Sequence, residues 1–270
     1  MNLFTALFTL VFVPIFLVSC AEPGDLLDLK KPKVKQERQK VGNVKLVFKP
    51  MLDVLFVVDD SGSMDNHQKR LAKNVSLLTK GIFANQLLDL HLGVLATTGS
   101  TRGGSGVLQG VPRFITKTTP LREARLASNI QLGTSGDFIE TVFAPVHNFF
   151  TPDRLTGPNQ GFYREEAYLA LVFITDAVDQ SDISAVALYE ELLQLKNNDS
   201  SKLIGYGVFV PSGDRSCQRD DSSKEPQKIE RFMDLISEGQ GNNTFSLCAE
   251  DYGEKLAALG DDLARRIGMF

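Results

Sequence analysis

The fold is decided by the stretch Asp53-Val54-Leu55-Phe56-Val57-Val58-Asp59-Asp60-Ser61-Gly62-Ser63-Met64. Its apolar, β-branched half predicts a strand that is buried on both faces, as in a parallel sheet. The small oxygen-bearing residues that follow stand where such a strand ends, and open α/β sheets bind their ligands at that end. Asp59, Ser61 and Ser63 supply one carboxylate and two hydroxyls with the spacing D-x-S-x-S. A helix N-cap needs only one of the three, whereas together they are hard oxygen donors suited to Mg²⁺ or Mn²⁺.

Composition and pattern predict one α/β domain. The chain has 270 residues, 43% of them hydrophobic, which is enough to bury a substantial single core. Its formal net charge of −4 gives no indication of nucleic acid as a partner. Apolar strand-like runs alternate with amphipathic helical repeats, which predicts a doubly wound, mostly parallel sheet. Strands are expected at residues 54–58, 90–96, 113–116, 168–175, 203–210 and 244–247, and helices at 71–82, 138–150, 183–195, 229–236 and 256–267.

The N-terminal segment is interpreted as a targeting signal. Residues 3–18 are almost wholly apolar and end at Leu17-Val18-Ser19-Cys20, which is typical of a secretory signal. The last four residues resemble a bacterial lipobox, which implies a lipoprotein signal peptide over residues 1–19 and lipidation of Cys20. An uncleaved membrane anchor is the alternative, because the first two residues carry no Lys or Arg. Ala21 favours lipid anchoring in the cell envelope at the outer membrane.

The segment after the signal is interpreted as a tether. Residues 20–43 are poor in apolar side chains and rich in lysine, typical of a solvated linker; contact with anionic lipid headgroups is the alternative. The domain is expected to occupy residues 44–270. With Cys20 lipidated, Cys217 and Cys248 remain as an even pair in an oxidising compartment. We expect them to form a disulfide worth about 3–4 kcal/mol in the chain-entropy model.

A second buried strand ends on a carboxylate in the same way as the first. Residues 168–175 are as apolar as the opening strand and are followed by Asp176. If the two strands flank the switch point of the sheet, Asp59 and Asp176 overlook one crevice. Thr134, in the turn Gly133-Thr134-Ser135-Gly136, then supplies a third hydroxyl. Such an oxygen-only site keeps an exchangeable position on Mg²⁺, which an acidic group of a partner can fill.

At these residues the chain resembles the von Willebrand factor type A (VWA) domain and its metal-ion-dependent adhesion site (MIDAS), over residues 50–268. Asp59, Ser61 and Ser63 match the first motif of the family, Thr134 its isolated threonine and Asp176 its distal aspartate. The resemblance implies a Rossmann-like sheet with one antiparallel edge strand and helices on both faces. It also implies a membrane-anchored binding module, not an enzyme, that recognises an acidic residue of a protein ligand through Mg²⁺ or Mn²⁺. Neither nucleic acid nor a small-molecule cofactor is expected.

Phe162-Tyr163-Arg164 further resembles secreted bacterial lipoproteins of this class. That group often carries a run of acids after the strand, where this chain has Ala177-Val178, so a metal role for Asp179 stays open. Two other functions also stay open. One is a metal-dependent hydrolase or phosphotransferase that uses Asp59, although G-x-S-x-G and H-E-x-x-H are absent. The other is a metal-free assembly scaffold.

Four residues near the motif are given structural interpretations. Asp60 is expected to be a solvated spacer, and Gln68 an ordinary residue of the helix surface. Glu140, like Asp137, is interpreted as an acid of a first helical turn, where a negative charge stabilises the helix N-terminus; an acidic rim around the site is the alternative.

Overall fold

A computed structural model describes residues 49–98, 105–136, 139–217, 219, 224–238 and 243–268, all of them in the unit Val47–Phe270. The signal peptide, Cys20, the tether at residues 20–43 and Asp137 lie outside the described residues. Within the described ranges, no helix combines the length and the apolar character needed to cross a membrane.

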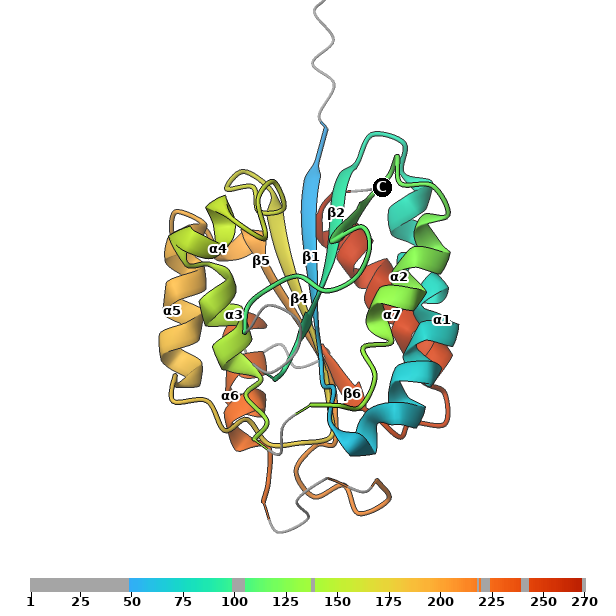
Figure 1. The fold of residues 1–270 in the computed structure, drawn as a ribbon, viewed down its shortest axis with the longest axis vertical. Coiled ribbons are helices and arrows are strands. Elements are labelled where there is room, and N and C mark those ends of the chain that lie inside the picture. The colour runs from blue at the N-terminus through green and yellow to red at the C-terminus, as the bar shows by residue number, and fades with distance from the viewer. Residues whose placement is uncertain are drawn as a thin grey trace, which may run out of the picture. The chain divides into compact units, whose positions relative to one another are not determined.

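One sheet of six strands, in the order β3-β2-β1-β4-β5-β6, forms the centre of the domain (Figure 1). β3 runs antiparallel to its neighbour at one edge, and the other five strands are parallel, so the expected fold class is confirmed. The chain goes from β1 to β2 in one direction and returns past β1 to β4, which makes the switch point lie between β1 and β4. The strands are β1 (Met51–Val58), β2 (Asp89–Ala96), β3 (Phe114–Thr116), β4 (Tyr168–Thr175), β5 (Leu203–Phe209) and β6 (Thr244–Ser246).

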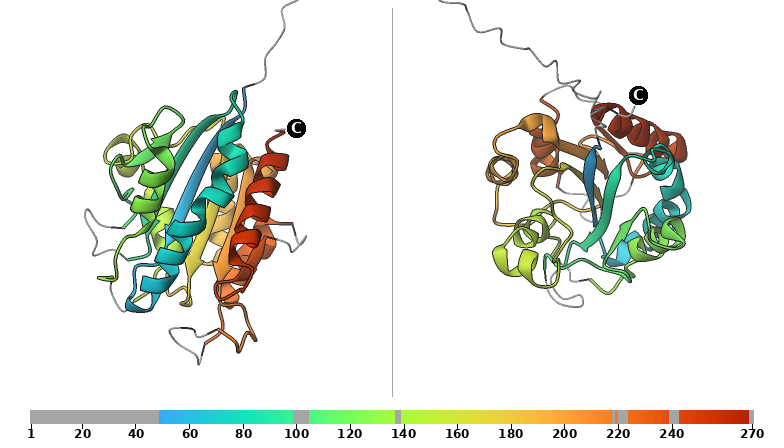
Figure 2. Two further views of the ribbon diagram at one scale, coloured as in Figure 1. Left: turned by 90° about the vertical axis from the view of Figure 1, so that its right-hand side faces the viewer. Right: turned by 90° about the horizontal axis from the view of Figure 1, so that it is seen from above.

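Helices cover both faces of the sheet, and each face has its own apolar core (Figures 1 and 2). Alternate residues of β1 supply the two cores: Val54, Phe56 and Val58 pack toward α1, α2 and α7, and Leu55 and Val57 toward α3, α5 and α6. The described helices are η1 (Gly62–Met64), α1 (Asp65–Ala84), α2 (Arg122–Ile130), α3 (Phe143–Phe149), α4 (Pro152–Thr156), α5 (Ala185–Leu195), η2 (Ser200–Lys202), α6 (Gln227–Ile236) and α7 (Tyr252–Arg266).

Three helical predictions were wrong. α2 was not expected, because only three of its residues are buried and its apolar repeat is short. α4 was expected to be loop; none of its five residues is buried, so it leaves no apolar pattern. α3 begins at Phe143, five residues after the expected start. The chain before α3 is held by neighbouring loops: the N–H of Gln180 donates to the carbonyl of Glu140 at 2.8 Å, and Thr141 Oγ1 donates to the carbonyl of Thr97 at 2.8 Å.

An ion cluster around Asp53 holds the N-terminal end of the sheet. Arg164 donates to Asp53 Oδ1 from Nε at 2.9 Å and from Nη2 at 2.7 Å, and its backbone N–H donates to Oδ2 at 2.8 Å. Arg164 also pairs with Asp89 at 2.8 Å. Burial raises the pKa of Asp53, and the Arg164 guanidinium opposes that rise. This segment therefore joins the start of β1 to the loop before β4.

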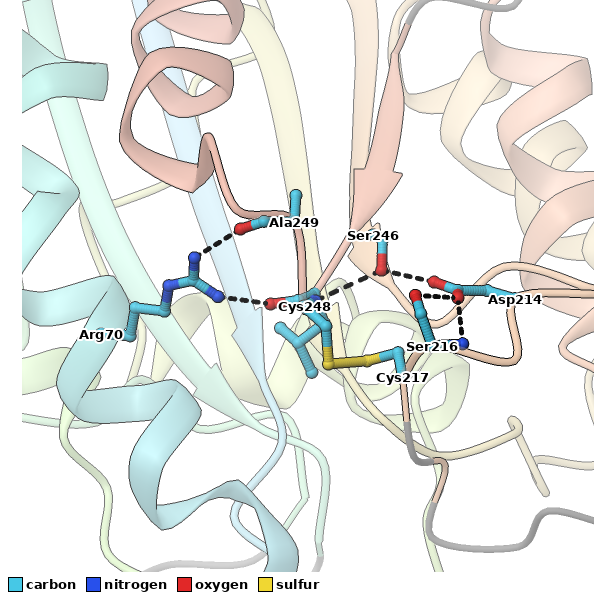
Figure 3. Close-up of a disulfide and its surroundings, with 8 residues drawn as sticks. Arg70, Asp214, Ser216, Cys217, Ser246, Cys248 and Ala249 are labelled. Atoms are coloured by element: carbon cyan, nitrogen blue, oxygen red, sulfur yellow. Dashed lines mark hydrogen bonds between the residues drawn. A yellow bond between two sulfur atoms is a disulfide. The ribbon is translucent and has the colours of Figure 1, made fainter.

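The expected disulfide between Cys217 and Cys248 is confirmed, with the two Cα atoms 5.5 Å apart. It joins the loop after β5 to the connection between β6 and α7 (Figure 3). Arg70 of α1 donates to the carbonyls of Leu247 and Ala249 on either side of Cys248. The start of α7 is thus fixed both covalently and by hydrogen bonds.

Candidate metal centre

Four of the five predicted metal ligands converge at the C-terminal ends of β1 and β4. The pairing of these strands continues past their ends, because the N–H of Asp59 donates to the carbonyl of Ile174 at 2.9 Å. Ser63 Oγ donates to Asp176 Oδ1 at 3.1 Å, and it lies 3.1 Å from Ser61 Oγ. The crevice that the sequence predicted between the two strand ends therefore gathers oxygen atoms from both.

The chain leaves β1 in a turn centred on the Asp59 carboxylate. Oδ1 accepts the N–H of Ser61 at 2.8 Å, and Oδ2 accepts the hydroxyl of Thr175 at 2.5 Å. Ser61 is extended, with φ −69° and ψ 166°, and it makes no side-chain cap for the helix that follows. α1 also has no side-chain cap at its N-terminus. The capping explanation of the motif therefore finds no support in the geometry.

Gln68 fixes the end of β1 to the loop that carries Thr134. Its Nε2 donates to the carbonyls of Asp59 at 2.8 Å and of Gly133 at 2.9 Å, and its Oε1 accepts the N–H of Gly133 at 3.1 Å. The prediction that Gln68 lies on the surface was wrong, since the residue is buried. It stands three residues before Leu71 and so shares the inward face of α1.

Thr134 lies in a turn that is attached at both ends to the β1 loop. Gly133 is held by Gln68, and the N–H of Gly136 donates to the carbonyl of Asp60 at 2.9 Å. A Cβ at Gly136 would lie 2.7 Å from that carbonyl oxygen, so only glycine allows the close approach. Thr134 is exposed, and among the described residues its hydroxyl hydrogen-bonds to none of the other four side chains. The fold brings Thr134 to the site without fixing its hydroxyl there.

Two acidic residues, Asp60 and Glu140, lie behind the site, although the sequence predicted other positions for them. Asp60 is buried, not solvated, and both of its carboxylate oxygens accept the Thr98 hydroxyl, at 3.0 and 2.9 Å. Glu140 is only 1% exposed and precedes α3, so it is not an acid of the first helical turn. Its Oε2 accepts the hydroxyl of Thr97 at 3.1 Å. Both predictions for these residues were wrong.

Three buried carboxyl groups thus lie together, at Asp59, Asp60 and Glu140. Burial raises the pKa of Asp59, against the hydrogen bonds that it accepts from Thr175 and Ser61. Burial and the neighbouring Asp59 charge raise the pKa of Glu140 to about 8, and burial also raises that of Asp60. Within the described part of the chain, no Lys or Arg pairs with any of the three. Raised pKa values mean that this cluster tends to retain a proton at neutral pH, and an external cation can take the place of that proton.

The donor set consists of hydroxyls and carboxylates rather than of many charged ligands. No group of three or more His, Cys, Asp and Glu side chains in the described ranges is arranged to hold a metal. The predicted ligands include only two carboxylates, of Asp59 and Asp176, and their other donors are hydroxyls. Oxygen donors of this kind match Mg²⁺ or Mn²⁺, which retain water molecules, better than they match zinc.

The turn in which an aspartate accepts the N–H of a serine two residues later occurs elsewhere in the chain, but there the serine hydroxyl points differently. Three other aspartates use one carboxylate oxygen to accept both the N–H and the O–H of a serine two residues later. The distances are 2.5–3.2 Å in the pairs Asp179 with Ser181, Asp199 with Ser201, and Asp214 with Ser216. Ser61 donates its N–H to Asp59 in the same way, but its hydroxyl lies against that of Ser63. At the candidate site the hydroxyl is therefore directed toward the other oxygen donors.

Asp179, whose metal role the sequence left open, is occupied by other contacts. Its Oδ2 pairs with Lys228 at 2.6 Å, and its Oδ1 accepts the backbone N–H of Phe143 at 3.0 Å. The residue caps the start of α3 and has its own cation, so it acts as a structural residue.

The chain was compared with known proteins. No protein-family model matches the chain, and no curated protein matches it. Among solved structures, the pilus adhesin SpaC from Lactobacillus rhamnosus GG is 14% identical over 82% of this chain and 30% of that chain, with a TM-score of 0.48. A von Willebrand factor type A protein from Catenulispora acidiphila is 15% identical over 82% of this chain and 43% of that chain, with a TM-score of 0.43. Proximal thread matrix protein 1 from the mussel byssus, with a zinc-occupied MIDAS motif, is 12% identical over 81% of this chain and 48% of that chain, with a TM-score of 0.44. The chain thus spans less than half the length of these three proteins, and at such identities the likeness concerns the fold alone.

Proposed function

We propose that this protein binds a divalent cation through Asp59, Ser61, Ser63, Thr134 and Asp176 and uses the cation to recognise an acidic residue of a protein partner. The observation that carries the proposal is the buried carboxyl cluster behind Asp59, which no cation of the described chain neutralises, beside two serine hydroxyls that converge on Asp176. When bound, Mg²⁺ or Mn²⁺ supplies the positive charge that this cluster lacks and offers a position to a partner's carboxylate.

Some residues of the site would hold the cation, and others orient the carboxylates of Asp59 and Asp176. The hydroxyls of Ser61 and Ser63 are neutral donors, so they hold a cation without cancelling its charge toward a partner. Thr175, the last residue of β4, donates its hydroxyl to the Asp59 carboxylate at 2.5 Å and so fixes the orientation of that carboxylate. Asp176 reaches the site from the neighbouring strand, and its carboxylate is oriented by Ser63. A site built this way attracts an anionic side chain rather than repelling it.

We further propose that the protein is anchored by a lipid on Cys20 at the outer membrane of the cell envelope. The start of β1, where the chain enters the domain, supports a tether at the N-terminal end of that strand, away from the candidate site. β1 starts at Met51 and ends next to Asp59, so its 8 residues separate the chain entry from the site by about 26 Å at about 3.3 Å per residue. Mass spectrometry of the purified protein tests the anchor: an N-terminus that begins at Met1 with an unmodified Cys20 contradicts it.

Calorimetric titration of Mg²⁺ and of Mn²⁺ into the purified protein tests the metal site. We expect saturable binding in the wild type and its loss in Asp59→Ala. Asp199→Ala is the matched control, because Asp199 forms the same turn with a serine but lies on the exposed surface. That variant should bind as the wild type does.

Two outcomes of the titration contradict the proposal. A wild type that is silent at millimolar metal leaves the metal-free scaffold as the function to pursue. An unchanged isotherm in Asp59→Ala moves the cation to another site. Turnover of a phosphoester by the metal-loaded protein, lost in Asp59→Ala, would instead favour the phosphotransferase alternative.

A further inference from the structure

A large apolar side chain stands exposed beside the candidate metal centre. Ile139 is 63% exposed, whereas the next residue, Glu140, is 1% exposed. Glu140 accepts the hydroxyl of Thr97 at 3.1 Å, and the N–H of Thr97 donates to the carbonyl of Val58 at 3.2 Å. One threonine therefore separates Glu140 from the last residue of β1, and Ile139 lies one residue further out.

The backbone that follows Ile139 is held by hydrogen bonds to two other segments. The carbonyl of Glu140 accepts the N–H of Gln180 at 2.8 Å, and Thr141 Oγ1 donates to the carbonyl of Thr97 at 2.8 Å. These bonds tie the residues after Ile139 to the segments that follow β2 and β4, on either side of β1. Isoleucine is branched at Cβ and has few rotamers. Covering Ile139 with a partner therefore costs little entropy of its side chain.

Any partner that reaches the metal centre must also cover Ile139. A specific protein interface buries about 800 Å² on each side, which corresponds to a disc with a radius of about 16 Å. Gly136, three residues before Ile139, donates its N–H to the carbonyl of Asp60 at 2.9 Å. Glu140, the residue after Ile139, accepts the hydroxyl of Thr97, so Ile139 lies inside that footprint. Of the other exposed large apolar residues, Leu87 stands just before β2, at the opposite end of the strands. Its exposed fraction is 48%, which makes it a matched control.

We propose that Ile139 determines the specificity of the metal centre, selecting partners in which the metal-binding Asp or Glu is accompanied by an apolar residue close in the sequence. Ile139 offers only methyl and methylene groups, so a charged or strongly polar neighbour of the acid loses hydration there without gaining a hydrogen bond. This inference rests on the proposed function, because the acidic residue is recognised through the cation.

The test is selection of a random linear peptide display library on the immobilised purified protein, with Mg²⁺ and, separately, with a chelator. The best peptides are then measured in solution by fluorescence polarisation. We expect Mg²⁺-dependent enrichment of an acidic residue with an apolar residue within a few positions. Ile139→Ser should weaken those peptides about tenfold or more, since apolar area is then no longer buried. Ile139→Val should recover most of the affinity, and Leu87→Ser should leave it unchanged.

Mg²⁺ affinity from calorimetry serves as the readout for damage to the site, and it should be equal in all three variants because neither Ile139 nor Leu87 is one of the proposed ligands. Acidic peptides without an apolar neighbour, or an Ile139→Ser affinity within twofold of the wild type, overturn the inference while leaving the proposed function intact. An absence of any Mg²⁺-dependent acidic peptide counts against both.

Discussion

Two fully buried aspartates lie at opposite ends of β1, Asp53 near its start and Asp59 directly after its last residue, and their charged surroundings differ. Asp53, at the N-terminal end, accepts three hydrogen bonds from Arg164, two of them from the guanidinium. Asp59, just past the C-terminal end, accepts a backbone N–H and a hydroxyl from described residues, none of them charged, and the carboxyl of Glu140 lies beside it. One end contains its own counter-charge and the other does not.

The two aspartates are both buried, and their electrostatic environments differ because, among the described residues, only Asp53 has a positively charged side chain beside it. Burial is the largest influence on both aspartates and raises the pKa of each. At Asp53 the charge of Arg164 acts against it, whereas at Asp59 only hydrogen bonds to neutral groups do so. Because an unpaired buried carboxylate is costly in free energy, the Asp59 end is the one where an external cation gains most. The comparison therefore separates a structural aspartate, Asp53, from the candidate cation ligand, Asp59.

The largest expected effect follows from removing the counter-charge at the structural end. Arg164→Met leaves Asp53 buried without its guanidinium partner, with Nδ1 of the His91 ring 3.6 Å from Oδ1, and it should lower the free energy of unfolding by about 3–5 kcal/mol. Urea denaturation followed by circular dichroism measures this. The double variant Asp53→Asn with Arg164→Met should recover part of the loss, since no charge is then buried. A loss below about 1 kcal/mol in the single variant would mean that Arg164 does not neutralise Asp53 as the structure indicates.

The second prediction adds the missing charge at the other end. Mg²⁺ at a hundredfold excess over its dissociation constant should raise the free energy of unfolding by about 2.7 kcal/mol, because the folded state alone binds it. Thermal and urea unfolding with Mg²⁺ and with a chelator measure the difference. Asp59→Asn should show none of this stabilisation, while Arg164→Lys, which keeps the charge at the structural end, should retain it. Equal Mg²⁺ stabilisation of Asp59→Asn would remove the distinction between the two ends.

The third prediction is that, without metal, replacing Asp59 and replacing Asp53 change the free energy of unfolding in opposite directions. Asp59→Asn removes a buried negative charge that no described cation pairs with, so it should leave stability unchanged or raise it by about 1–2 kcal/mol. Asp53→Asn removes the buried carboxylate from the Arg164 guanidinium, which keeps only its pair with the exposed Asp89, and should lower stability. Urea unfolding of both variants in chelator gives the two signs. Destabilisation of both by the same amount would show that the two carboxylates contribute alike to the fold.

Much of the site was predictable because its geometry follows from strand ends. The apolar runs before Asp59 and Asp176 identified two buried strands, and adjacent parallel strands end at the same edge. The pairing of Val58 with Ile174 then brings Ser63 to 3.1 Å from Asp176. Gln68 was also within reach of the sequence, since its spacing from Leu71 places it on the buried face of α1.

The carboxyl cluster could not be predicted, because it depends on contacts between distant segments. Asp60 is buried through Thr98, and that contact exists only because β2 pairs with β1 in a register that aligns Val58 with Ala96. Glu140 lies between α2, a helix with too few buried residues to leave a clear pattern, and α3, and it is held by the hydroxyl of Thr97, which follows β2. Neither residue has a local sequence signature for burial. Both were assigned by their local context, and the assignments failed for that reason.

The smallest expected effect tests whether the structural end contains an unpaired charge of its own. Lys196 is buried there and donates to the carbonyls of Arg164 at 2.9 Å and Glu165 at 3.2 Å. Within the described ranges it has no carboxylate at ion-pair distance, and its ammonium lies 4.4 Å from the centre of the Tyr163 ring. Burial lowers the pKa of Lys196 to about 8, although the charge of Asp53 opposes this.

The sign of the pH dependence follows from that lowered pKa. Between pH 8 and the ordinary lysine value of 10.5, the unfolded chain binds a proton that the folded chain has released. The unfolded state then binds more protons, so stability due to Lys196 rises with pH across this window. Relative to Lys196→Met, the wild type should gain on the order of 1–2 kcal/mol from pH 8 to about pH 10 in urea unfolding. Parallel pH profiles for the two proteins would mean that Lys196 is adequately neutralised by Asp53, and the structural end would then balance its charges completely.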